Sequence, residues 1–473
     1  MIVDENRKCT EGETLNRRQK SLPVEKLFLI LMVIFGLLFL FIQPIYSVPD
    51  EGNHFHTSYA IFHDDYKGDE FRRYFKNEDI ESSRDKSYFK KTFVDKQDFR
   101  KNKLAFNFTY KDIQLLPQAI GELIGELIYP SLGIVFYFGR LMNLILYTGA
   151  IYFAIKKAKF AQLLMATITL LPISIQQAAS LSYDVMFYVL IFISFSFITN
   201  LAVRREKLSP RFYIFTCLII LSFFLTKLSI FLMGLYFVTL PVELLGDNWL
   251  SKTIDKFWAF CDRHKQSVVL FACLIILFYI RHVFKDYGGL TVGLQVFINT
   301  FFRADFNVTL DSIVTTGMIG TFGSLLYRIP EWLVIINFIF LVMLAFCEEG
   351  VIIKKRMAVA SFSIWMLNII VVGVTMYLSW TIGALKHSDT LVSLGTQGRY
   401  YTPFLIGLAP IGIVLRQYIK VRISPNIVRK LFMSLMLFNL VFSLLLIIVY
   451  NYSAEGGYDI ILKVSERLHQ LVK

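Results

Sequence analysis

Long apolar stretches with few charges constrain this chain more than any other feature of its sequence. They recur along most of the 473 residues, and many approach the roughly 20 residues that cross about 30 Å of hydrocarbon as a helix. The composition agrees, because 55% of the residues are hydrophobic and only 18% are charged, whereas a soluble protein is about a quarter charged. The sequence therefore predicts an all-α polytopic membrane protein and excludes a soluble enzyme.

The apolar stretches predict about eleven transmembrane helices within a membrane domain over 27–450. A polar segment, 1–26, precedes the first of them. That first stretch is too long for a signal-peptide core and lacks a small-residue cleavage site, so we expect it to be retained as a helix. The predicted spans are 27–46, 131–155, 160–177, 183–203, 211–226, 228–246, 267–284, 331–352, 357–379, 401–417 and 431–450.

The basic residues predict the direction of these helices. The formal net charge is +13, but its clusters recur at every second loop, which is the positive-inside pattern. The charge therefore indicates topology and not a nucleic-acid partner. The N-terminal segment is then cytoplasmic in a multi-pass cell-membrane protein. The clusters are Arg17-Arg18-Lys20, Lys156-Lys157-Lys159, Arg204-Arg205-Lys207, Lys252/Lys256/Arg263/Lys265, Lys354-Lys355-Arg356 and Arg416/Lys420/Arg422/Arg429/Lys430.

The extracytoplasmic side is predicted to carry two long loops and the C-terminal tail. The first loop, 47–130, is rich in aromatic residues and in charges of both signs. The second, 282–328, contains a half-apolar stretch over 292–302 that is typical of a helix lying in the membrane interface. The tail, 451–473, has an amphipathic helical pattern that favours the same location.

An acidic motif, Pro49-Asp50-Glu51-Gly52-Asn53-His54, stands at the outer end of the first predicted span. A carboxylate at headgroup depth is partly desolvated, which raises its pKa toward the range of a general base. Asp50 and Glu51 are therefore the candidate catalytic residues. The alternative is an ordinary solvated loop start.

Histidines follow the acidic motif closely, at His54, His56 and His63, with Asp64 beside the last. These side chains suggest a metal cluster, but histidines so near a helix end are more often solvated or hydrogen-bonded. We therefore predict no metal ligands and take His54 as a substrate-binding candidate. The five cysteines have no metal-binding spacing and predict no disulfide framework.

Three more charged residues are predicted at membrane depth. Asp184 begins the fourth span, either as a helix N-cap or as a second acid facing the cavity of Asp50. Lys227 lies between two apolar stretches with almost no loop, and its alternative role is snorkelling to the interface. Arg140 lies inside the second span and either contacts a ligand or pairs with a loop carboxylate.

A second motif, Gln397-Gly398-Arg399-Tyr400-Tyr401-Thr402-Pro403, opens the tenth predicted span. An arginine backed by tyrosine at a helix start binds phosphate through two hydrogen bonds. Gln397, Arg399 and Tyr400 are therefore candidate binding residues. An interfacial belt of arginine and tyrosine is the alternative.

Together, these motifs resemble those of an uncharacterised family of bacterial polytopic membrane proteins marked by Pro-Asp-Glu-x-x-His and Gln-Gly-Arg-Tyr-x-x-Pro. That family resembles the GT-C superfamily of membrane glycosyltransferases. The resemblance implies a polyprenyl-phosphate sugar donor, inversion at the anomeric carbon, and a catalytic role for Asp50, or for Glu51 if the register differs. It leaves open whether a divalent cation (Mg²⁺ or Mn²⁺) takes part.

The sequence thus predicts a GT-C-like transferase that moves a sugar from a polyprenyl-phosphate carrier to a cell-surface glycopolymer. Asp50 would take the acceptor proton, and Arg399 and Lys227 would stabilise the departing phosphate. A transporter or flippase for a lipid-linked saccharide is one alternative. A non-catalytic subunit of a polysaccharide assembly complex is another.

Overall fold

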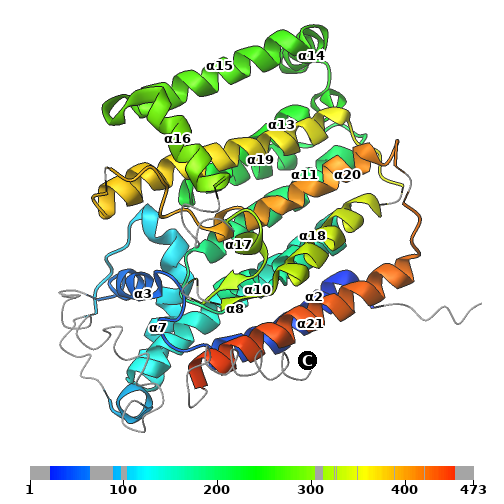
Figure 1. Cartoon of the computed structure of the whole chain (residues 1–473). Coiled ribbons are helices and arrows are strands. Elements are labelled where there is room, and N and C mark those ends of the chain that lie inside the picture. Colours follow the sequence, from blue (N-terminus) through cyan, green and yellow to red (C-terminus); the bar gives the residue numbers. More distant parts are fainter. Residues whose placement is uncertain are drawn as a thin grey trace, which may run out of the picture.

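The computed structural model describes residues 22–63, 89–96, 104–303, 313–323, 325, 327–348, 350–387, 389–419 and 421–452. Most of the predicted cytoplasmic segment 1–26, nearly all of the tail 451–473, and Asp64 lie outside these residues. The described chain is a bundle of helices, several of which run side by side across the molecule (Figure 1).

Six helical segments of the described chain are long and apolar enough to cross a membrane. The prediction of an all-α polytopic membrane protein is thereby confirmed, whereas the count of about eleven spans stays a prediction. The six are α2 (Val24–Ile42), α8 (Leu132–Lys157), α11 (Asp184–Val203), α15 (Lys265–Val283), α19 (Lys355–Met376) with its π-helical continuation η9 (Tyr377–Ala384), and α21 (Pro425–Tyr452).

The remaining predicted spans are shorter or interrupted. The span predicted over 160–177 divides into α9 (Gln162–Thr169) and α10 (Pro172–Ala178), because Pro172 lacks the N–H that would continue the helix. The other helices here are α12 (Pro210–Ser222), η5 (Phe223–Leu225), η6 (Leu228–Met233), α13 (Gly234–Thr239), η7 (Val242–Leu245), α14 (Trp249–Arg263), α18 (Glu331–Phe346), η10 (Gly398–Tyr400), η11 (Thr402–Gly407) and α20 (Leu408–Leu415).

Both predicted loops contain regular structure. Within 282–328, the helix predicted over 292–302 is observed as α16 (Gly289–Phe301), preceded by η8 (Lys285–Tyr287) and followed by α17 (Thr316–Ile319). A two-stranded antiparallel ribbon of β1 (Thr321–Phe322) and β2 (Tyr327–Arg328) ends this segment. In the described parts of 47–130, the elements are the α-helices α3 (Glu51–Tyr59) and α7 (Leu116–Ile128), the π-helix η2 (Lys90–Val94) and the 3₁₀ helix η4 (Tyr110–Leu115).

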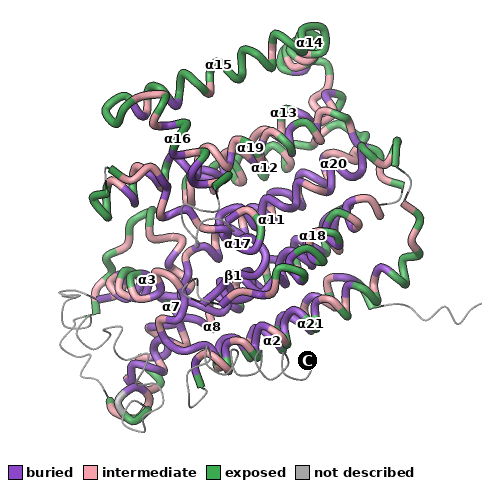
Figure 2. Tube along the Cα trace, viewed as in Figure 1, coloured by how far each residue is buried: buried purple, intermediate pink, exposed green. Residues whose placement is uncertain are grey.

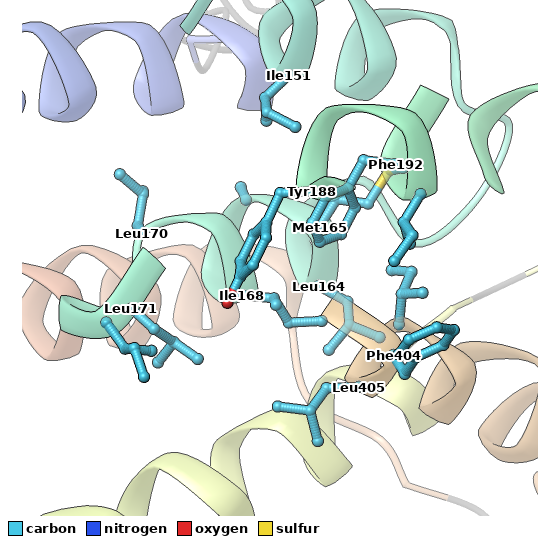
Figure 3. Packing of buried hydrophobic residues seen from close by; sticks show 14 of the residues in the cluster. Ile151, Leu164, Met165, Ile168, Leu170, Leu171, Tyr188, Phe192, Phe404 and Leu405 are labelled. Atoms are coloured by element: carbon cyan, nitrogen blue, oxygen red, sulfur yellow. The ribbon is translucent and has the colours of Figure 1, made fainter. Parts of the chain in front are cut away.

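The core lies around α11, and burial falls toward α15. Within an apolar stretch of 18 residues, 67% of α11 is buried inside the protein, compared with 6% of α15. Figure 2 shows this contrast, with purple at the centre of the bundle and green along α14 and α15. Figure 3 shows part of the core, to which Tyr188 and Phe192 of α11 contribute.

The two ends of the bundle carry different side chains. Basic residues stand at the helix ends on one side of the bundle: α8 ends at Lys157, and α19 begins at Lys355. Asp184 begins α11 at the other end, and the acidic motif follows α2 there. Arg399 lies beside Asp184 and Asp50. The structure therefore gathers the candidate site at the end opposite to these lysines.

Candidate functional site

Asp50 and Glu51 are adjacent, but they have different partners. α2 ends at Ile42, and the chain then turns through residues 43–50 before α3 begins at Glu51. Asp50 is the residue before α3 and has a left-handed backbone, with φ 65° and ψ 2°. Aspartate adopts this conformation more readily than most residues. The turn at Asp50 therefore places it before the helix and places Glu51 within the first turn of α3.

Glu51 forms a buried bidentate ion pair with Arg140 of α8. The Arg140 Nε and Nη2 atoms each donate to a Glu51 carboxylate oxygen at 2.8 Å, and neither side chain is exposed. Arg140 also donates to the carbonyl oxygens of Gln43 and Pro44, at 2.7 and 2.8 Å. The Leu181 N–H donates to Glu51 at 3.1 Å. Of the two roles the sequence leaves open for Arg140, the structure shows the carboxylate pair.

Asp50 pairs instead with Arg399, and the pairing continues through two more charged residues. Arg399 Nη2 donates to Asp50 Oδ2 at 2.8 Å. The Nε atom of Arg399 is 3.1 Å from Asp184 Oδ2, and Lys227 Nζ forms an ion pair with Asp184 Oδ1. Two carboxylates and two cations therefore alternate, and their formal charges cancel. We call these four residues the charged cluster.

Members of the charged cluster differ in their access to solvent. The side chains of Asp184 and Arg399 are 2% and 3% exposed, whereas that of Asp50 is 33% exposed. Burial opposes the charge of Arg399, but Tyr400, Asp184 and Asp50 outweigh it and raise the pKa of the guanidinium. Arg399 is therefore a permanent cation, and Asp50 is the more accessible of the two acids.

Asp184 is not the N-cap that the sequence offers as one alternative. α11 begins at Asp184, and its N-cap residue is Tyr183, without a side-chain cap. The Asp184 carboxylate contacts Lys227 and Arg399 instead. Asp184 is thus positioned by the start of α11 and by its ion pairs with Lys227 and Arg399.

The backbone around Arg399 is held by three neighbouring segments. The Tyr188 hydroxyl of α11 donates to the Arg399 carbonyl at 3.0 Å, and the Asn368 side-chain amide of α19 lies 3.4 Å from the Tyr400 carbonyl. Gly398 packs directly on the backbone of Gly317, where a Cβ atom would lie 2.0 Å from the Gly317 carbonyl carbon. Glycine is therefore required at 398 for this approach.

A cavity of about 430 Å³ borders the charged cluster. Asp50, His54 and Lys227 form its polar wall, and a second wall, from α19 and η9, is mainly apolar. The lining residues at the apolar wall are Val371, Val372, Thr375, Met376, Ser379 and Trp380. The cavity can therefore accept a molecule with one charged end and one apolar end.

Aromatic rings complete the polar wall. Lys227 Nζ lies 3.7 Å from the centre of the Tyr400 ring and 5.2 Å from that of Tyr183. Arg399 Nη2 also donates to the Tyr400 hydroxyl at 3.4 Å. A cation over an aromatic face is stabilised by the ring quadrupole. Tyr400 therefore contacts both cations of the cluster.

His54 lines the cavity as a neutral side chain. Its ring centre lies 4.4 Å from that of Tyr183. Burial and, to a smaller extent, the nearby Arg399 lower the pKa of His54 to about 4. Its Nδ1 atom has no hydrogen-bond partner within the described part of the chain. His54 is thus available as an uncharged hydrogen-bonding group.

His54 and His63, both within the described residues, have separate surroundings. His63 bonds the Tyr59 carbonyl at 2.8 Å and Glu126 at 3.0 Å, away from His54. Among the described residues, no group of three or more His, Cys, Asp or Glu side chains could hold a metal ion. Both acids of the cluster already contact cations, which disfavours Mg²⁺ or Mn²⁺ there.

The structure thus collects residues from four parts of the sequence at one cavity. Gln397 lies apart from it, beside a smaller cavity that Arg399 also lines. Glu51 and Arg140 lie behind the polar wall as a buried pair. Of the predicted residues, Asp50, His54, Lys227 and Tyr400 line the large cavity. Asp184 and Arg399 do not line it, but they contact residues that do.

Sequence reasoning missed the apolar wall. Thr375 and Ser379 line the cavity from a predicted span and stand four residues apart. That spacing places them on one helical face, which is the signal that could have identified this wall. Tyr183 was missed as well, although it directly precedes Asp184.

A family model described as "Predicted membrane protein (DUF2142)" matches residues 33–408. The matched range covers most of the chain and contains every residue of the charged cluster. No curated protein was found to match the chain, and no solved structure was found to match it.

Proposed function

Because the chain belongs to this family of predicted membrane proteins (DUF2142), whose description states no activity, we propose its function from the site itself. The protein is a membrane glycosyltransferase. It moves a sugar from a polyprenyl-phosphate donor to a glycopolymer of the cell envelope, with inversion at the anomeric carbon.

One observation carries the proposal: the large cavity joins a charged end to an apolar wall. Its lining includes the charged side chains of Asp50 and Lys227 and the apolar side chains of Val372 and Trp380. A lipid-linked sugar phosphate has the same division between a polar head and an apolar tail. Asp50 and Tyr183, which line the cavity, stand at the starts of α3 and α11. This location supports the proposal, because a membrane lipid presents its phosphate near the ends of spanning helices.

Asp50 is the proposed general base. It borders the cavity and is partly exposed, whereas Glu51 is fully buried and its two oxygens are held by Arg140. A base must reach the proton that it removes, at a heavy-atom distance of about 3 Å. Access therefore assigns the role to Asp50.

Arg399 links the base to the leaving group. In the reaction, the acceptor oxygen forms a bond to the anomeric carbon, and the bond from that carbon to the phosphate oxygen breaks. The electron pair goes to the phosphate, and the acceptor proton goes to Asp50. As Asp50 becomes neutral, its ion pair with Arg399 Nη2 is lost and only a weaker hydrogen bond remains. The guanidinium, which lies next to Asp50, then has less of its positive charge compensated, and this charge stabilises the negative charge that develops on the phosphate.

Lys227 supplies the second positive charge beside the cavity. Its Nζ is held between Asp184 and the Tyr400 ring. Asp184 positions both cations without bordering the large cavity, so we propose it as a positioning residue. His54, Tyr183 and Tyr400 contribute neutral polar groups to the same wall.

The location at helix ends favours a transferase over a transporter. Transporters bind their substrates near the bilayer midplane, often at broken helices. Here Asp184 begins α11, Asp50 precedes α3, and Arg399 lies in the short 3₁₀ helix η10. With the basic clusters facing the cytoplasm, the proposed site faces the outer leaflet.

Sugar transfer by purified protein tests the proposal directly. The donor is a radiolabelled hexose linked to a short polyprenyl phosphate, and membrane extract supplies the acceptor. Asp50→Asn should lower kcat by about 10²- to 10⁴-fold, the usual contribution of a general base. The matched control is Asp247→Asn, at an exposed carboxylate in the Lys252 ion pair. Undiminished transfer in Asp50→Asn would overturn the assignment, and donor flipping without transfer would favour a flippase.

A further inference from the structure

A second cavity, of about 50 Å³, is lined in part by residues that are chain neighbours of those lining the large one. The two cavities are separated by consecutive residues of two segments. Pro49 and Arg399 line the small cavity, whereas Asp50 and Tyr400 line the large one. The small cavity is therefore adjacent to the charged cluster. We call it the amide cavity, after the side chains that line it.

Three glutamines and two threonines provide uncharged polar groups to the lining of the amide cavity. Gln176 and Gln177 come from α10, Thr321 from β1, and Thr396 and Gln397 from the segment before η10. α10 packs against both α17 and β1, which brings these segments together. Figure 1 shows α10, α17 and the short strands near the centre of the bundle.

Four polar atoms around this cavity have no hydrogen-bond partner among the residues that the structure describes. They belong to side chains that are buried or nearly so: Gln176 and Gln177 are each 1% exposed, and Thr321 is 6% exposed. Leaving buried polar atoms unpaired is unfavourable, so such atoms normally have a ligand or water as partner. The atoms are Gln176 Nε2, Gln177 Oε1, Thr321 Oγ1 and Gln397 Oε1.

The chemistry of these atoms favours a neutral ligand. Two of them are amide oxygens that accept, one is an amide nitrogen that donates, and the hydroxyl does both. Arg399 is the one charged side chain among the described residues that line the cavity, and it is already paired with Asp50 and Asp184. The arrangement suits a hydroxyl or amide substituent.

The size of the amide cavity limits what it can hold. One water needs roughly 10 to 15 Å³ measured in this way, so about 50 Å³ accepts a small group and not a complete sugar ring. The group must therefore project from a ligand whose remainder lies elsewhere. Arg399 places that remainder next to Asp50.

We propose that the amide cavity is a specificity subsite for a neutral carbohydrate. It receives one hydroxyl-bearing or acetamido substituent of the sugar that reacts beside Asp50. Gln177, Gln397 and Thr321 are the specificity residues. This inference rests on the proposed function, because it assumes that a sugar occupies the neighbouring large cavity.

Binding of free sugars tests the subsite without requiring transfer. Saturation-transfer NMR on the full-length protein in detergent uses glucose and N-acetylglucosamine as probes, with glucuronate as the charged comparison. We expect wild type to bind at least one neutral sugar, and Gln177→Leu and Thr321→Val to weaken that binding tenfold or more. Thr321→Val is nearly isosteric, so it separates lost recognition from lost folding. Gln417→Leu, at an exposed position outside the cavity, is the matched control.

Transfer kinetics then identify which sugar occupies the subsite. A rise in the donor KM in Gln177→Leu assigns the substituent to the donor sugar, and a rise in the acceptor KM assigns it to the acceptor. Wild-type binding and kinetics in both cavity variants would show that the cavity holds water alone and would overturn the inference. If Asp50→Asn keeps full transfer while sugar binding still depends on Gln177, the catalytic assignment fails and the subsite stands.

Discussion

The side chains of Asp50 and Arg399 are 2.8 Å apart, although 349 positions separate them in the chain. Arg399 also contacts Asp184, so one guanidinium joins an accessible acid to a buried one. Loss of its planar fork should therefore disturb the whole charged cluster, even when the positive charge is kept.

Arg399→Lys should abolish most activity while keeping the charge. A lysine ammonium cannot reproduce the planar fork that contacts Asp50 and Asp184 on different nitrogens. We expect kcat/KM for sugar transfer to fall by about 10²- to 10³-fold, as for loss of an electrostatic stabiliser. Arg422→Lys, at an exposed position, should behave as wild type. Full activity in Arg399→Lys would mean that charge alone suffices.

Glu51→Gln should affect folding more than chemistry. Its partner Arg140 is fully buried and would lose the bidentate carboxylate, and breaking a buried ion pair typically costs about 3–5 kcal/mol. Thermal unfolding in detergent should show a much lower midpoint for Glu51→Gln than for Asp50→Asn. The reverse order would contradict the separation of roles between these adjacent acids.

Lys227→Met should destabilise the protein by leaving Asp184 with one cationic partner. The Asp184 side chain is 2% exposed, so the unbalanced charge costs on the order of a few kcal/mol. Lys227→Met combined with Asp184→Asn should recover part of the loss, because the acid is then neutral. Unfolding midpoints of the two single variants and the double variant measure this coupling. Additive effects would show that the pair contributes no interaction energy.

The thermal stability should depend on pH through His54. Its pKa is about 4 in the folded protein and about 6.5 when the chain is unfolded. Between these values, the unfolded chain binds a proton that the folded protein does not. Stability contributed by neutral His54 is therefore complete above pH 6.5 and is lost as the pH falls toward 4, by at most about 3 kcal/mol.

The His54→Gln variant isolates this contribution. Titration of the nearby acids affects both proteins, so the difference between the two melting curves reports the histidine. We expect that the unfolding midpoint of His54→Gln falls less between pH 7 and 5 than that of wild type. His264→Gln, outside the large cavity, should follow wild type. Parallel curves for His54→Gln and wild type would argue against a neutral buried imidazole.

Gly398→Ala should displace the segment that carries Arg399. The added Cβ would lie 2.0 Å from the Gly317 carbonyl carbon and 2.5 Å from the Met318 nitrogen, so the backbone must shift. Enzymes lose about 10²-fold in rate from displacements near 1 Å, and a similar loss of transfer is expected. The control, Gly149→Ala, has open space around the new methyl group and should retain activity.

Hydropathy predicts the long spans well, because the bilayer fixes their length. The span predicted over 183–203 corresponds to α11 (Asp184–Val203), and that over 131–155 corresponds to α8 (Leu132–Lys157). The span predicted over 211–226 is less regular, since α12 ends at Ser222 and a 3₁₀ turn follows. Such breaks depend on tertiary contacts, which hydrophobicity does not encode.

Residue type predicts the members of the charged cluster but not their pairing. Asp50 and Glu51 are equivalent candidates in the sequence. They separate because Asp50 has a left-handed backbone and because Arg140 lies behind Glu51. Both causes depend on the folded chain. The amide cavity was missed for a similar reason, since Gln177 and Thr321 meet only after α10 packs against β1.

The wide spacing of the ion-paired residues has a consequence for biosynthesis. The ribosome completes α11 long before it reaches Arg399, so a nascent chain inserts Asp184 into the membrane ahead of one of its two cationic partners. Lys227 arrives first, only one hairpin later, and pairs with the same carboxylate. If Lys227 pairs early, the translocon can release the first half of the protein with the charge of Asp184 already compensated. The segment that carries Arg399 then completes the charged cluster.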